Sequence, residues 1–171
     1  MSRVIVADFL RELYAEETGV VPILLVTITH DQLPEPIRLS TDPTQRIPEL
    51  TTASQVVYGT VSRGQTFLFY PMSLTLPSDS DNGPKAMSIE IDNVHRDITT
   101  TIRSISTPPK FNVEIITSDS LNTVVAEWPE YLLTNTSINA STVSGKLELE
   151  TLTNEPFPAG NFNPSMFPGL F

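Results

Sequence analysis

The chain has 171 residues and a formal net charge of -10 at pH 7, and it has no cysteine. With 20 Asp and Glu against 10 Lys and Arg, its surface repels phosphate backbones, which argues against nucleic-acid binding. The lack of cysteine excludes a disulfide framework, a thiolate nucleophile and a cysteine-based zinc site, while the length is sufficient for one domain with its own core.

Two kinds of targeting segment are not expected. No apolar run in the sequence approaches the roughly 18 residues needed to span a bilayer. The first residues also lack the basic region and the uninterrupted apolar core of a secretory signal. We therefore expect neither a membrane span nor a secretory signal.

The first predicted element is an amphipathic helix that begins at Ser2 and ends near Thr18 and Gly19. Apolar residues recur at the spacing of one helix face, and these are Val6, Phe9, Leu10, Leu13 and Tyr14. The opposite face is charged, and we expect it to face solvent.

Short strands are predicted after this helix. Residues 20–29 are rich in Val, Ile, Leu and Thr, and residues 37–40 can return antiparallel to them. Residues 56–61 form a further predicted strand, followed by a turn. Residues 66–76 are predicted as a strand pair or as one bent strand, because Pro71 interrupts them.

Two segments lack a clear period and are predicted as exposed loops. Residues 41–54 contain two prolines and a run of Thr and Ser, and residues 77–85 are rich in Asp, Ser and Pro. We expect both loops to lie on the surface, where they are candidates for contacts with other molecules.

The clearest periodicity lies in residues 87–117 and predicts a strand, a helix and a second strand. The apolar residues first alternate, then recur at spacings of four, four and three, and then alternate again: Met87, Ile89 and Ile91; Val94, Ile98, Ile102 and Ile105; Phe111, Val113 and Ile115. Pro108 and Pro109 end the helix. The crossover permits parallel pairing of the two strands, and an antiparallel arrangement is equally open.

Two long strands are predicted near the end of the chain, at residues 124–134 and 142–152. In the second, the predicted buried side consists of Val143, Leu147, Leu149 and Leu152. The elements together predict a mainly β domain, a barrel or sandwich of about seven strands, with an N-terminal helix and one central helix inserted between strands. We assign residues 1–154 to this domain.

Residues 155–171 are predicted to form an extended, Pro- and Phe-rich C-terminal tail. Its four prolines lack the N–H that a sheet interior requires, and it contains no Lys or Arg. A tail this apolar must cover a surface, either on its own domain or on a neighbouring subunit, and the two alternatives are equally open. Its large apolar residues are therefore candidates for subunit contacts: Phe157, Phe162, Met166, Phe167, Leu170 and Phe171.

Candidates for catalysis or ligand binding are few. His95 lies between Asp92 and Asp97, a pattern that can form a proton-transfer pair, although a polar first turn of the predicted helix explains it better. Trp128 and Tyr131 can form a small sugar-stacking platform, but packing in the core is the favoured interpretation. We expect no catalytic residue, no metal site and no cofactor, and hence a protein that is not an enzyme.

Four segments share a distinctive order of turn, aromatic and proline residues. They are YGTVSRGQTFLFYPMSLTLP at 58–77, SIEIDNVHRDITTTIRSI at 88–105, VVAEWPEYLLTNTSI at 124–138 and EPFPAGNFNPSMFPGLF at 155–171. Together they resemble a family of small tail proteins from long, non-contractile-tailed bacteriophages and prophages, catalogued as a domain of unknown function. The ending Phe-Pro-Gly-Leu-Phe is the most specific part, and the run of three threonines at 99–101 is a departure, since threonine is a weak helix former.

The resemblance implies a structural role in the tail tip, beyond the tape-measure protein. Such distal tail or hub-adaptor proteins are β-barrels or sandwiches whose copies form a ring around the tail channel and join the tail tube to the central hub. The resemblance thus implies a self-associating protein, a hexamer rather than a trimer, with tail tube, tape-measure and hub proteins as partners. It implies a place in the virion after synthesis in the bacterial host cytoplasm. The alternative function is a carbohydrate-binding β-sandwich module for host attachment.

Overall fold

The structure, a computed structural model, describes residues 11, 14–15, 18–52, 55–77, 86–92, 104–139 and 141–149. The strands in these residues are β1 (Pro22–Thr29), β2 (Ile37–Ser40), β3 (Gln45–Arg46), β4 (Tyr58–Ser62), β5 (Gln65–Phe69), β6 (Met72–Thr75), β7 (Met87–Asp92), β8 (Lys110–Thr117), β9 (Ser120–Ile138) and β10 (Thr142–Leu149). They form one ten-stranded sheet in the order β3-β4-β5-β2-β1-β8-β9-β10-β7-β6. The sheet is mixed, because β2 and β5 pair in parallel while the other neighbours are antiparallel.

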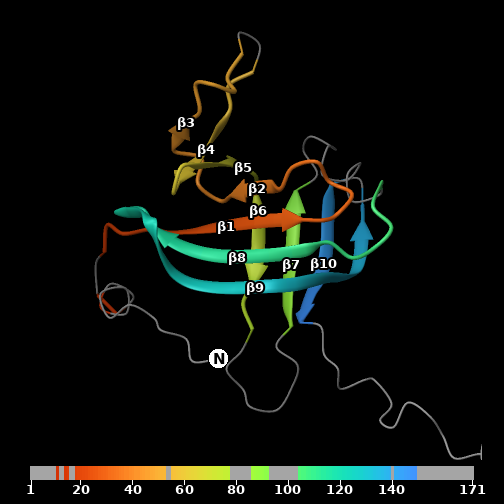
Figure 1. Ribbon diagram of the computed structural model, residues 1–171. Coiled ribbons are helices and arrows are strands. Elements are labelled where there is room, and N and C mark those ends of the chain that lie inside the picture. Colours follow the sequence, from red (N-terminus) through yellow and green to blue (C-terminus); the bar gives the residue numbers. More distant parts are fainter. Residues whose placement is uncertain are drawn as a thin grey trace, which may run out of the picture.

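The sheet folds over on itself into two layers. In Figure 1, β1, β8 and the first part of β9 run across the view, and β6, β7 and β10 lie behind them at a steep angle. Buried side chains from both layers meet in the main core, which consists of Val26, Ile28, Leu39, Met87, Ile89, Ile91, Phe111, Val113, Trp128, Tyr131, Leu133 and Leu147. Crossed layers of this kind require a strand that passes from one layer to the other.

β9 is that strand, and one of its register irregularities is a bulge at Pro129 and Glu130. These two residues oppose a single residue of β8. Pro129 has no N–H for the ladder, and Glu130 adopts a φ of 60°. Residues three apart in a regular strand point to opposite faces, but the extra residue turns both Trp128 and Tyr131 into the core, where they are 7% and 3% exposed.

A second bulge lies further along β9, where Asn135 and Thr136 oppose Gly145 of β10. Asn135 adopts a φ of 49°, which asparagine tolerates better than most residues. A Cβ on Gly145 would lie 2.5 Å from Cδ1 of Leu133, so the glycine allows close packing of the two strands. β9 pairs with β10 on both sides of this bulge, from Tyr131 to Ile138, and lies in the second layer there.

A smaller core lies on the other face of β1 and β8. It consists of Ile23, Leu25 and Ile116, and β5 covers it with Phe67. The first layer is therefore covered on both faces at this end, which explains the uninterrupted apolar residues from Ile23 to Val26 in β1.

The mainly β class predicted from the sequence is confirmed. β1 and β2 lie within or at the predicted segments and pair antiparallel as expected. The alternation of β7 is also confirmed, since Met87, Ile89 and Ile91 are buried and the residues between them are exposed. Pro71 separates β5 from β6, as its position predicted, and the two strands occupy distant places in the sheet order.

Other predictions about the strands are wrong. The described residues contain ten strands rather than about seven. One of them, β3, lies in residues 41–54, which were predicted as an exposed loop, and Ile47 of the same segment is buried. β7 and β8 pair neither in parallel nor antiparallel with each other, because each lies in a different layer. Leu149 is 42% exposed rather than buried, since β7 begins opposite Leu147 and does not extend beside it.

The buried side predicted for β8 is only partly right. Phe111 and Val113 are buried in the main core, but Ile115 is only partly buried. Glu114 and Ile116, on the opposite face, are buried because the β4–β5 hairpin covers that side of the strand.

Several predictions fall on residues outside the described ranges. These are most of the N-terminal helix, the central helix over 93–103, the loop from residue 78 to 85, and Leu152. The tail at 155–171, with its six candidate contact residues, also lies outside, as does the boundary at residue 154. No helix has its bounds within the described residues.

A substitution at Gly59 tests the close packing of β4 and β5. A Cβ at this position would collide with the backbone oxygen of Phe67 on β5, an atom that cannot move without distorting the strand. We expect Gly59→Ala to lower the free energy of unfolding by about 2–3 kcal/mol, as overpacked sites do. Gly19→Ala is the matched control, since a Cβ at Gly19 meets no atom within 4 Å. Urea unfolding measures both, and equal stabilities would contradict this packing.

Candidate functional site

The tip of the β4–β5 hairpin is joined to β8 by an ion pair. The two central residues of the turn, Arg63 and Gly64, have φ values of 50° and 74°, which suit the two-residue turn of a twisted hairpin. The turn points the Arg63 guanidinium at the Glu114 carboxylate, with Nη1 donating to Oε1 at 3.0 Å and Nη2 donating to Oε2. Glu114 is only 6% exposed, so this paired geometry compensates for the burial of its charge.

Two further hydrogen bonds fix the same hairpin tip. The N–H of Arg63 donates to Oδ1 of Asn122 at 2.6 Å, and Oγ of Ser62 donates to the carbonyl oxygen of Leu121 at 2.6 Å. The hydrogen bond to Glu114 raises the pKa of Arg63 above its ordinary value, against the desolvation that lowers it. Both charges are thus held in a structural contact between two hairpins.

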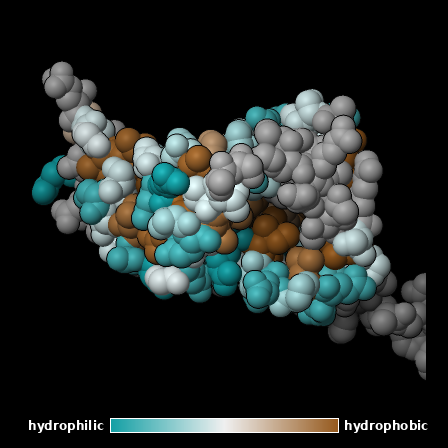
Figure 2. Space-filling view, turned by 90° about the horizontal axis from the view of Figure 1, so that it is seen from above, coloured by the Kyte–Doolittle hydropathy of each residue, from teal (hydrophilic) through white to brown (hydrophobic). Residues whose placement is uncertain are grey.

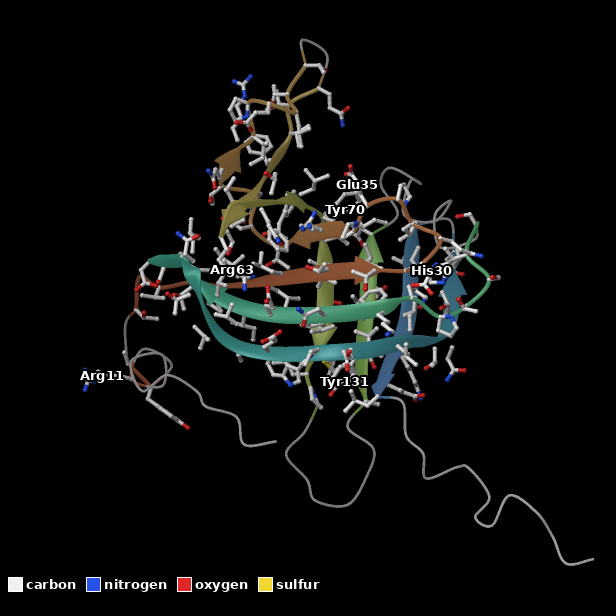
Figure 3. All side chains as sticks on the ribbon, in the orientation of Figure 1. Arg11, His30, Glu35, Arg63, Tyr70 and Tyr131 are labelled. Carbon is white, nitrogen blue, oxygen red and sulfur yellow. The ribbon has the colours of Figure 1, made fainter. Side chains whose placement is uncertain are left out.

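His30 lies at the other end of β1 from Arg63 (Figure 3). The N–H of Gln32 donates to Nδ1 of His30 at 3.1 Å, so Nε2 is the nitrogen that donates to Oγ1 of Thr107, at 2.6 Å. The Gln32 side chain also exchanges two hydrogen bonds with Ser106. This network ties the β1–β2 connection to the segment that precedes β8.

Only one residue of the predicted proton-transfer cluster lies within the described residues. Asp92 is an exposed residue at the end of β7, while His95 and Asp97 lie outside the described residues. The sugar-stacking platform is wrong, because Trp128 and Tyr131 are buried in the main core. The favoured interpretation of these two rings, core packing, is confirmed.

A polar groove of about 290 Å³ crosses the outer face of the second layer. Its lining includes outward-facing residues of β6, β7 and β10, namely Ser73, Thr75, Ser88, Glu90, Ser144 and Lys146. Polar residues alternate with core residues in β7, as expected for a sheet with one solvated face.

An apolar groove lies beside β6, the last strand in the sheet order. We call it the edge groove, and its volume is about 250 Å³. It combines residues from β1, β6 and β8, and its lining includes Pro22, Leu24, Met72, Leu74, Leu76 and Ile115. Leu76 is 40% exposed, and none of the described lining residues is charged.

A third feature is the arm, which we define as residues 43–52 and 55–58 and which extends away from the two layers at the top of Figure 1. At its base, β3 pairs with the first residues of β4. Three large apolar side chains of the arm are exposed: Leu50 at 49%, Val56 at 49% and Tyr58 at 43%. Oγ1 of Thr51 accepts from the N–H of Val57 and donates to the carbonyl oxygen of Ile47, so the two sides of the arm are linked.

The apolar surface is not spread evenly. Seen from above, hydrophilic residues dominate much of the described surface, while hydrophobic atoms gather in a recess near its middle (Figure 2). Among the described residues, no group of His, Asp and Glu is placed to hold a metal ion. Within the same residues, no helix is long and apolar enough to cross a membrane.

The ion pair and the edge groove were both missed by sequence reasoning. The sequence predicts a turn after residue 61, and the alternation of Phe111, Val113 and Ile115 places Glu114 on the side opposite to the predicted buried residues. The adjacent Ile115 and Ile116 were the available signal that both faces are covered, because consecutive residues of a strand point to opposite faces. The edge groove had no such signal, because its lining comes from segments far apart in the sequence.

The described residues define a mainly β protein with a large mixed sheet, an arm with exposed apolar side chains and an apolar groove. The chain belongs to the family described as Domain of unknown function (DUF1833), which matches residues 8–162. No curated protein matches the sequence.

The pair formed by Arg63 and Glu114 gives a test of this structural assignment. Arg63→Met leaves the Glu114 carboxylate buried without its cation, and we expect the free energy of unfolding to fall by about 1–3 kcal/mol. The loss is smaller than for a fully buried pair, because the Arg63 side chain is 38% exposed.

The double variant Arg63→Met with Glu114→Gln removes both charges and should recover part of that loss. Arg46→Met serves as the control, since it removes an exposed arginine elsewhere. The single variant Glu114→Gln completes the cycle. Urea unfolding measures all five proteins, and strictly additive losses in the double variant would contradict the pairing.

Proposed function

We propose that this protein is a structural component of a bacteriophage tail tip, a distal tail protein whose copies form a ring that joins the tail tube to the central hub. The observation that carries the proposal is the arm, which presents Leu50, Val56 and Tyr58 to solvent on an extension of the sheet. Exposed apolar side chains grouped in this way mark surfaces that bind other proteins. The resemblance of four segments to tail proteins of long, non-contractile-tailed phages supplies the biological setting.

The polar contacts support a structural role rather than an enzymatic one. Arg63 and Glu114 satisfy each other between two hairpins, and His30 is used to hold Thr107. These charged and imidazole groups therefore stabilise the positions of hairpins and connections. A rigid sheet with a projecting arm suits a protein whose task is to hold neighbours in fixed positions.

The partners that follow from this proposal are other copies of the chain, in a hexamer rather than a trimer, and the tail tube, tape-measure and hub proteins. The protein is made in the bacterial host cytoplasm and resides in the virion. The net charge of -10 disfavours contact with the DNA that passes through the tail, because like charges repel. A negative surface also keeps free copies apart until they meet an apolar contact site.

The arm can be tested by complementation of a phage that lacks this gene. Leu50→Asp with Val56→Asp places charges on the proposed contact surface, and we expect infectious particles to fall by about tenfold or more, with defective tail tips in electron micrographs. Gln55→Asp is the matched control, since it adds a charge at an exposed polar position of the same arm.

Antibody labelling of intact particles completes the test and should place the protein at the tail tip. A normal yield of infectious, tailed particles from the phage without the gene would refute the proposed function. Equal effects of the arm variant and its control would refute the role given to the arm.

A further inference from the structure

We propose that the edge groove binds the Pro- and Phe-rich tail, residues 155–171, of a second copy of this chain. This inference rests on the proposed function, and it names the surface through which successive copies join. It assigns the groove an occupant with a definite chemistry, an extended, apolar and proline-stiffened peptide without basic residues.

The shape of the edge groove suits such an occupant. Its volume of about 250 Å³ is slightly below the roughly 300–1,000 Å³ of pockets that enclose drug-sized ligands. It therefore fits one or two anchoring side chains of a longer peptide. β6 is the last strand of the described sheet, so the groove opens at an edge along which an extended chain can lie.

The residues of the tail match this surface. Its four prolines prevent it from pairing as a regular strand, so it must bind mainly through side chains. Proline-rich peptides bind apolar grooves in this way, because their extended conformation is already formed and costs little entropy to order. Four phenylalanines, a methionine and a leucine supply anchors for a lining of Leu74, Leu76 and other uncharged residues.

Charge restricts where two copies can touch. Each chain has a net charge of -10, so most surface pairings between copies are repulsive. The described groove lining carries no charge, and the tail carries one acidic residue, Glu155, in 17 residues. These two parts can approach each other without bringing many like charges together.

In the proposed ring, the occupant of each groove is the tail of a second copy. β10, after which the tail follows, and β6, which lines the groove, flank β7 on opposite sides and run to the same end of the layer. Because β10 ends only one strand away from β6, the mixing experiment below separates a contact between copies from one within a chain. The tail and the groove are different surfaces, so a contact between them joins one copy to the next head-to-tail. Contacts of this type form a closed ring when the rotation from each copy to the next brings the last copy back to the first.

A peptide titration tests the occupant. The probe is a fluorescent peptide of residues 155–171, and the receptor is the full chain with Phe162→Ser and Phe167→Ser, which weakens its own tail. We expect saturable binding that Leu76→Glu in the receptor weakens by about tenfold or more, because a charge enters the apolar groove.

Leu149→Glu is the matched control, since Leu149 is 42% exposed and Leu76 is 40% exposed, but Leu149 does not line the groove. It should change affinity less than twofold. No saturable binding, or equal losses in both variants, would overturn the proposal. Competition by two unlabelled peptides gives a further outcome. If the peptide of residues 2–14 displaces the fluorescent probe more strongly than the peptide of residues 155–171 does, the groove belongs to the N-terminal segment and the proposal is overturned.

Mass measurements on mixtures test whether the contact is between copies. Chains with Leu76→Glu keep the tail but lose the groove, and chains with Phe162→Ser and Phe167→Ser keep the groove but lose the tail. Each should remain monomeric alone, whereas their mixture should form a one-to-one complex. Peptide binding without this complex would assign the tail to its own chain and overturn the contact between copies. A phage without the gene that forms normal tails would refute the tail-tip function while leaving a positive titration intact.

Discussion

β9 has to belong to both layers of the sheet, and the rest of the structure depends on how it bends. Its bulge at Pro129 and Glu130 adds a residue opposite β8, which brings Trp128 and Tyr131 to the same side. Without this bend the two largest rings of the strand could not both enter the main core. The position of β10, and through it those of β7 and β6, follows from its pairing with the part of β9 after this bend, from Tyr131 to Ile138.

In the part of the chain that the structure describes, the sheet does not close, and its two ends carry the arm and the edge groove. β3 lies at one end of the strand order and belongs to the arm, while β6 lies at the other and lines the edge groove. Unpaired sheet edges attract other chains, and proteins either protect them or use them. In the proposed ring, the acidic surface keeps free copies apart, and the arm and the groove are the apolar surfaces at which specific contacts form.

Local alternation was enough to predict the strands that have one solvated face. Met87, Ile89 and Ile91 are the clearest case, because the exposed residues between them preserve the period of two. The period failed in β8, where Glu114 and Ile116 are buried by a hairpin from a distant part of the sequence. The prediction that Leu149 is buried was wrong for a related reason, because its exposure depends on where β7 begins.

The surfaces were less predictable than the strands. Pro129 inside an apolar strand pattern signalled a bulge, and a sequence reader could have deduced from it that Trp128 and Tyr131 share a face. The edge groove could not be deduced, because it forms only when β1, β6 and β8 converge. The residue types that line the groove can be read from the sequence. The groove itself forms only when strands far apart in the sequence pair in the sheet.

The central claim is that copies of this chain form a ring at the tip of a phage tail. A cryo-electron microscopy reconstruction of the tail tip, from a phage that carries this protein, tests it most directly. The account predicts a ring of this fold, sixfold rather than threefold, between the tube and the hub. Tail-tip density that is fully explained by other proteins, with this fold absent from it, would contradict the account.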